Sequence, residues 1–117
     1  MKTRGRETTQ AAMQTYPNLS GIFAINDPSA LGAYSALEEA GKADQVKIIA
    51  FDGQPEGKQA IKDGRIYADP VQFPDKIGRQ TAKAIVAYFR GDDVPAELLI
   101  PTELYRQADA QNDPTLN

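Results

Sequence analysis

The spacing of apolar residues switches several times between a helical period and short apolar runs. Apolar positions three and four residues apart predict helices over residues 6–16, 27–40, 55–63 and 75–90. Short runs bounded by turn residues predict strands over residues 21–25, 46–51, 66–71 and 98–104. The first two runs are almost wholly apolar, as in strands buried on both faces. Helices alternating with strands predict an α/β fold, an open parallel sheet with helices on both faces.

Turn and capping residues refine these boundaries. Asp27 followed by Pro28 is typical of an N-cap and a first-turn proline, and Gly41 lies where a C-terminal cap belongs. Pro70 cannot donate a ladder hydrogen bond, so the third strand should lie at an edge or end early. The residues after Tyr105 are polar and are predicted to fray. Because the chain opens with a helix, we expect a strand that precedes this sequence.

Composition excludes several classes of function. A chain of 117 residues has room for one small domain, and its net charge of −3 provides no basic face for a nucleic-acid partner. The chain has no cysteine and no histidine, so disulfides, thiolate metal sites and the commonest general base are absent. We expect neither a metal nor another cofactor. No apolar run has the length of a membrane span, and we expect no secretory signal within this sequence.

Polar side chains recur at the carboxyl ends of three predicted strands, where open parallel sheets bind their ligands. These side chains are Asn26, Asp52 and Gln72. Amides donate and accept hydrogen bonds and an ionised carboxylate accepts, which is the mixture that a neutral polyol needs. Each residue also has a structural interpretation, because Asp52 before a glycine fits an ordinary turn and Phe51 beside it fits the core. The recurrence at three successive strand ends favours binding.

Several collinear segments resemble a known family. Residues 26–33, residues 40–42, residues 51–53 and the two stretches 62–64 and 72–78 are similar to the carboxyl-terminal lobe of ribose-binding-protein-like (type I) periplasmic sugar-binding proteins of ABC transporters. The resemblance covers residues 6 to 106. It implies that residues 1–106 form an incomplete lobe, including a crossover helix at 75–90, and that residues 107–117 form a polar tail.

The resemblance also implies a function. In the family, the residues that match Asn26, Asp52 and Gln72 bind sugar hydroxyls, so these three residues are the predicted ligand-binding set. The implied protein is not an enzyme; its ligand is a monosaccharide, its partner an ABC permease and its location the periplasm. Since the family's first strand is absent, the strand at 21–25 should become an edge. We therefore expect a homodimer formed through that edge or by exchange of the helix at 75–90.

Two other classes of protein are alternatives. The effector-binding core of a LacI-type transcription repressor shares this fold and has a similar Asn-Asp segment. An upstream signal peptide or an upstream helix-turn-helix would separate the two interpretations. An enzyme on a flavodoxin-like sheet would need a glycine-rich phosphate loop or a catalytic constellation, and the sequence contains neither.

Overall fold

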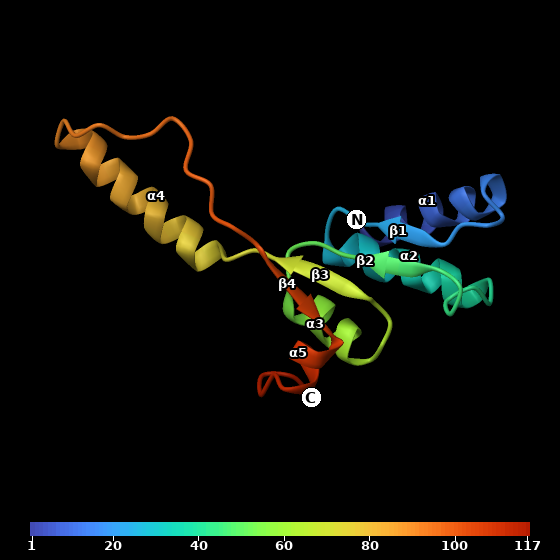
Figure 1. Ribbon diagram of the computed structural model, residues 1–117. Helices are drawn as coiled ribbons and strands as arrows, with labels where there is room; N and C mark the ends of the chain where they lie inside the picture. Colours follow the sequence, from blue (N-terminus) through green and yellow to red (C-terminus); the bar gives the residue numbers. More distant parts are fainter. The chain divides into compact units, whose positions relative to one another are not determined.

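The computed structural model describes all 117 residues (Figure 1). The chain divides into a sheet unit, Met1–Val71 with Glu103–Asn117, and a helix unit, Gln72–Thr102. The helices are α1 (Lys2–Thr15), α2 (Asp27–Glu39), α3 (Pro55–Lys62), α4 (Pro74–Phe89) and α5 (Gln107–Gln111). The strands are β1 (Gly21–Phe23), β2 (Lys47–Ile49), β3 (Ala68–Val71) and β4 (Glu103–Arg106).

The four strands form one sheet in the order β1-β2-β3-β4. β1, β2 and β3 are parallel, whereas β4 runs antiparallel to β3. The α/β class is confirmed, but the expectation of a wholly parallel sheet is wrong for the last strand. Val71 and Glu103 bracket the helix unit and are register partners. The chain therefore re-enters the sheet at the end where it left, so β4 must run backwards, and it begins five residues later than predicted.

Pro70 lies in an interior strand, contrary to the predicted edge. β3 is flanked by β2 and β4, and Pro70 pairs with Leu104 of β4. The ladder toward β2 is sparse, because Ile49 pairs with Ala68 and the next bridge joins Asp52 to Val71. The interruption falls at the residue that has no N–H to donate. Proline is thus accommodated inside the sheet by a gap in the pairing.

The helices of the sheet unit cover one face of the sheet. Ile48 of β2 is buried in the core and Ile22 of β1 packs against it, whereas Phe23 and Tyr67 are 66% and 59% exposed on the other side. Right-handed crossovers that advance in one direction place successive helices on the same face. The second helical layer predicted from the sequence therefore does not occur within this unit, and β1 is an edge strand as expected.

Glycines allow α1 and α2 to pack closely. A Cβ atom at Gly32 of α2 would collide with the Lys2 carbonyl oxygen, and one at Gly5 of α1 would collide with the Ser29 backbone. Arg6, which follows Gly5 in α1, donates two hydrogen bonds to the carboxylate of Glu39 at the end of α2, the shorter at 2.7 Å. Two small residues thus decide the separation of these helices.

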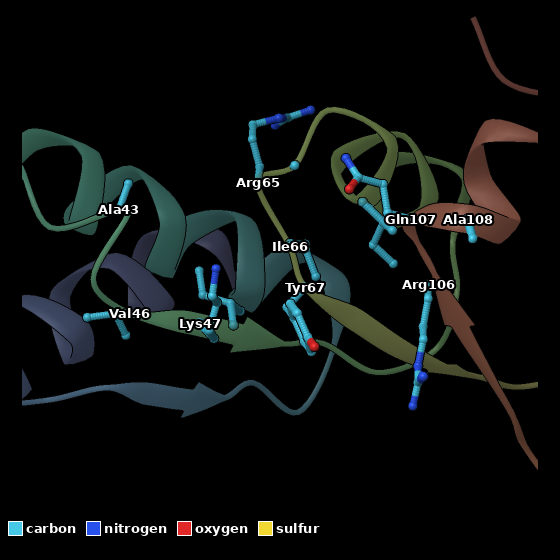
Figure 2. A pocket seen from close by; sticks show the side chains of 12 residues that line it. Ala43, Val46, Lys47, Arg65, Ile66, Tyr67, Arg106, Gln107 and Ala108 are labelled. Atoms are coloured by element: carbon cyan, nitrogen blue, oxygen red, sulfur yellow. The ribbon is translucent and has the colours of Figure 1, made fainter.

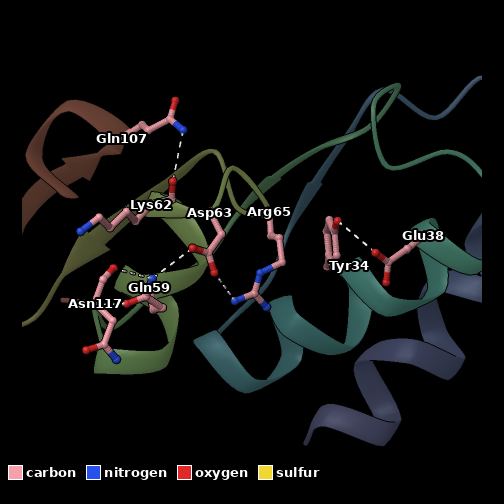
Figure 3. A network of polar contacts seen from close by, with 8 residues as sticks. All are labelled: Tyr34, Glu38, Gln59, Lys62, Asp63, Arg65, Gln107 and Asn117. Atoms are coloured by element: carbon pink, nitrogen blue, oxygen red, sulfur yellow. Dashed lines mark hydrogen bonds and ion pairs between the residues drawn. The ribbon is translucent and has the colours of Figure 1, made fainter. Parts of the chain in front are cut away.

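The chain after Tyr105 is ordered against the sheet unit, so the predicted fraying is wrong. Ala110 of α5 is fully buried in the core. Figure 3 shows the Gln59 side chain linked to the Asn117 backbone and Gln107 reaching the Lys62 carbonyl oxygen on α3. The Tyr105 hydroxyl donates to Asp113 at 2.7 Å. The few apolar residues of this polar stretch, Ala108, Ala110 and Leu116, were too weak a sequence signal to reveal this packing.

The helix unit consists of α4 and the extended stretch that follows it. Residues 98–100 line a shallow groove with Ile77, Thr81 and Ala84 of α4. No residue of α4 is buried, and Tyr88 and Phe89 are 69% and 82% exposed. None of the helices is both long enough and apolar enough to cross a membrane.

Candidate functional site

The loops after β1 and β2 meet at the carboxyl edge of the parallel strands. The Gln54 backbone N–H donates to Asp27 Oδ2 at 2.6 Å and so joins the two loops. The Asp52 N–H donates to the Pro70 carbonyl oxygen at 3.2 Å, and Asp52 bridges Val71. The segments carrying Asn26 and Asp52 are therefore held side by side, next to the end of β3.

Asn26, and not Asp27, is the N-cap of α2. Asn26 Oδ1 accepts the Ser29 N–H at 3.0 Å, and Asn26 Nδ2 contacts the Met1 sulfur at 3.0 Å. Asp27 is instead buried, so its predicted capping role is wrong by one position. Asn26 is half-buried, and its amide carries a second N–H. This side chain can cap the helix and still donate to a ligand.

Asp52 is the one non-glycine residue with a positive φ, at 112°. This backbone conformation is costly for a residue with a Cβ, and such outliers gather at binding and catalytic sites. Gly53 follows with φ 73°, and a Cβ there would collide with the Val71 side chain. Asp52 is half-buried and accepts a long hydrogen bond, 3.5 Å, from Gln54 Nε2. A turn needs a glycine here, but it does not need a strained aspartate.

Phe51 also lies at this edge, two residues after the end of β2. Gln72 directly follows β3 and is the first residue of the helix unit, and it is half-buried. Phe51 was predicted to be a core residue, but it is half-buried and packs edge-on against exposed Phe23, with ring centroids 6.5 Å apart. An aromatic pair therefore lies on the open side of the β1 and β2 ends.

A second carboxylate lies behind this edge, and sequence reasoning did not select it as functional. Asp69 of β3 and Asp27 of α2 are 0% and 1% exposed and interact with each other. Burial, followed by the neighbouring Asp27, raises the pKa of Asp69 to about 8. Burial also raises the pKa of Asp27. The only sequence signal was an aspartate within a strand, immediately before Pro70.

One hollow of the sheet unit lies away from this edge. A hollow of about 400 Å³ is lined by Lys47, Tyr67 and Arg106, among others (Figure 2). Lys47 is the first residue of β2 and Arg106 is the last of antiparallel β4, so this hollow lies at the opposite end of the sheet from Asp52. This hollow is therefore not part of the predicted ligand-binding site. No group of three or more acidic side chains is arranged to hold a metal ion.

Comparison with known proteins identifies the family. The family described as "Periplasmic binding protein domain" matches residues 2–93. The ribose import binding protein RbsB of Salmonella typhimurium is 38% identical over 103 residues, which are 88% of this chain. The RbsB protein of Escherichia coli K12 is 35% identical over a stretch of the same length. The chain spans 34% of the length of each of these relatives.

Solved structures agree with the sequence relatives. An ABC transporter periplasmic solute binding protein from Actinobacillus succinogenes, with bound D-allose, has a TM-score of 0.86 at 25% identity. The binding protein of the arabinose ABC transporter from Shewanella sp. ANA-3, bound to L-arabinofuranose, has a TM-score of 0.84 at 27% identity. Both cover 96% of this chain, which in turn covers 39% and 38% of theirs. The chain belongs to the periplasmic binding protein domain family, and it matches a lobe-sized stretch of the family's sugar-binding members.

Proposed function

We propose that this chain supplies one side of a monosaccharide site in the solute-binding component of an ABC importer. The observation that carries the proposal is the strained, half-buried Asp52 beside the Asn26 loop at the ligand edge of a parallel sheet. The names of two similar proteins, a ribose import binding protein and a D-allose-binding periplasmic protein, support the same ligand class. This family consists of solute-binding proteins and not enzymes.

The chemistry of the candidate residues suits neutral sugar hydroxyls. Asn26 and Gln72 are expected to donate to hydroxyl oxygens, and Asp52 to accept from two adjacent hydroxyls. Phe23 and Phe51 form an apolar surface beside them for the C–H face of a sugar ring. None of the three polar residues is a cation, so a phosphorylated sugar would lack a partner for its charge.

The partner and the location follow from the importer assignment. The sugar-loaded protein would deliver its ligand to an ABC permease in the membrane, and it would do so from the periplasm, as other members of the family do. A transcription repressor core remains the alternative with this fold. The relatives are named as import or periplasmic sugar-binding proteins, and this favours transport.

We further propose that the chain forms a homodimer. β1 is an edge strand. Its last residue, Phe23, is exposed, and so is Ile25, two residues later. An apolar edge with unpaired N–H and C=O groups is a template for pairing with a second copy. In the helix unit, the exposed apolar residues Ile85, Val86 and Phe89 of α4 give a second reason for association, by exchange of this unit between copies.

The ligand class can be tested by saturation-transfer NMR. Neutral pentoses and hexoses at millimolar concentration should receive saturation from the protein, whereas the corresponding sugar phosphates should not. The Asp52→Ala variant should lose the transfer, and Asp44→Ala, at an exposed surface position, should retain it. Transfer that survives in Asp52→Ala, or that favours the phosphates, would refute the proposed site.

A further inference from the structure

Two buried carboxyl groups face each other where α2, β3 and the β2–α3 loop meet. Asp27 and Asp69 are both almost wholly inaccessible to solvent. Asp27 Oδ2 accepts from the Gln54 N–H at 2.6 Å. The remaining oxygens, Asp27 Oδ1 and both oxygens of Asp69, have no donor at ordinary hydrogen-bond geometry, although the Gly53 N–H faces Asp69. Buried polar atoms are normally hydrogen-bonded, so three unpaired carboxyl oxygens require an explanation.

No cation neutralises the pair. Apart from the two carboxyl groups themselves, one charged side chain acts on both of them. It is Asp52 in the β2–α3 loop, which is an acid and not a cation. From α3, Lys58 directs its ammonium group to the Tyr105 ring, 5.0 Å from the ring centroid. Across β4, the Tyr105 hydroxyl is bonded to Asp113. If both carboxyl groups were ionised, no proton would lie between Asp27 Oδ1 and Asp69, and burial would oppose both charges.

A single proton removes the conflict. We propose that Asp27 and Asp69 share one proton, with the Asp69 carboxyl group donating to Asp27 Oδ1, and that this bond is a positioning element of the candidate sugar site. Asp27 then stays ionised, with one oxygen on the Asp69 proton and the other on the Gln54 N–H. In this bond the protonated oxygen of Asp69 is the donor, and Asp27 Oδ1, which would otherwise have no partner, is the acceptor.

The pair can position the site because it ties its loops together. Asp27 follows Asn26 directly, Gln54 lies two residues after Asp52, and Asp69 lies in the strand that precedes Gln72. The space is closed on the α3 side, since a Cβ at Gly57 would collide with the Asp27 carboxyl group. Loss of the shared proton would put two charges into this enclosed space and push the loops apart. The role in the site rests on the proposed function, whereas the shared proton does not.

The pH dependence has a defined sign. Burial and the neighbouring carboxylate raise the pKa of Asp69 in the folded chain to about 8, from an ordinary value of 3.8. Between these two values the folded chain holds a proton that the unfolded chain releases. The free energy of unfolding should therefore fall as the pH rises toward about 8 and become level above it.

The shared proton is tested directly by carbon-13 NMR of the aspartate carboxyl groups in the wild-type chain. One carboxyl carbon of the pair should titrate above pH 6 while the other remains ionised through the acidic range. The Gln54 amide and the Asn26 side-chain amide should shift with the same midpoint, which a purely structural acid remote from these loops would not produce. If both carboxyl groups titrate below pH 5, no proton is shared.

Variants give an independent test. Asp69→Asn keeps a neutral donor at every pH, so its urea midpoint should be level between pH 6 and 9, where the wild-type midpoint falls. Its Gln54 amide should remain at the position seen in the low-pH wild type. Asp44→Asn, at an exposed position, should keep the wild-type slope. Equal slopes in wild type and Asp69→Asn would overturn the proposal. Sugar binding enters neither measurement, so a failure of the proposed function would be recognised separately.

Discussion

The Gln54 backbone N–H donates to Asp27 Oδ2 at 2.6 Å, across 27 residues of sequence. This contact joins the loop after β1 to the loop after β2, and it stands behind the two residues, Asn26 and Asp52, that are expected to meet a ligand. The buried Asp27 carboxylate therefore fixes the two loops relative to each other, while Asn26 and Asp52 are half-buried.

Replacing Asp52 by glycine should raise stability and abolish binding. Asp52 has φ 112°, a conformation that glycine adopts without strain. Relief of that strain is worth about 1 kcal/mol, so the free energy of unfolding from urea titration should rise by that order. Sugar-dependent NMR shifts should vanish, because the acceptor for the hydroxyls is gone. A glycine variant that is less stable than the wild type would show that the conformation is not strained.

Two substitutions at Asn26 should separate its role as the cap of α2 from its proposed role in sugar binding. Asn26→Ala removes the cap of α2 and should cost about 1 kcal/mol of stability. Asn26→Ser keeps a capping oxygen and should retain most of that stability, but it loses the amide donors and should bind sugar more weakly. Urea denaturation and a sugar titration of both variants measure the two effects. If serine restored binding as well, Asn26 would act only as a cap.

The contact between α1 and α2 should tolerate no added methyl group at Gly32. A Cβ there meets the Lys2 carbonyl oxygen, so Gly32→Ala should cost at least about 1–3 kcal/mol by overpacking. A Cβ at Gly78 of α4 would meet no atom within 4 Å beyond its chain neighbours and its own helix backbone, so this glycine serves as the matched control. Gly78→Ala should be neutral or raise helicity, because alanine favours helices. Thermal unfolding followed by circular dichroism compares the two. Similar melting temperatures would contradict the close packing.

Self-association should depend on the open face beside β1. Light scattering after size-exclusion chromatography should find a dimer at tens of micromolar, a rough working concentration. Phe23→Lys places a charge at the edge strand and should yield a monomer. Tyr16→Lys is the control, because Tyr16 lies outside the sheet and is 62% exposed, close to the 66% of Phe23. The Tyr16→Lys chain should remain dimeric. A wild-type chain that stays monomeric would refute the dimer.

The sequence predicted the α/β class and most elements because their apolar periods and end signals agree. Gly41, predicted as a C-terminal cap, has φ 68° as such a position requires, and Gly64 after α3 has φ 76°. The direction of β4 could not be predicted, since it depends on where the chain returns to the sheet after Gln72–Thr102. The one-sided helical cover likewise depends on the direction of the crossovers and not on any local pattern.

The candidate site was predictable at the level of residue type and strand end. The strain at Asp52 was not, because an aspartate before glycine also suits an unstrained turn. The cap was misplaced by one residue, since asparagine and aspartate cap helices equally well and only the burial of Asp27 distinguishes them. The pairing of Asp27 with Asp69 was invisible, because it joins residues from separate elements.

Affinity is expected to be low for this chain on its own. One lobe leaves part of the sugar in solvent, so its hydrogen bonds compete with water. We expect a dissociation constant of about millimolar or weaker, equivalent to about 4 kcal/mol. Isothermal titration calorimetry that gave micromolar binding of a pentose or hexose would show that the site is more complete than described.

The most direct test of the proposed sugar site is a two-dimensional NMR titration of the chain with D-ribose. Saturable shifts should be confined to the side-chain amides of Asn26 and Gln72 and to the backbone amides of Asp52 and Gly53. The same titration of Asp52→Ala should show none of them. Shifts that appear instead around Lys47, Tyr67 and Arg106, or no saturable shift up to a concentration on the order of 100 times the expected millimolar constant, would contradict the proposed site.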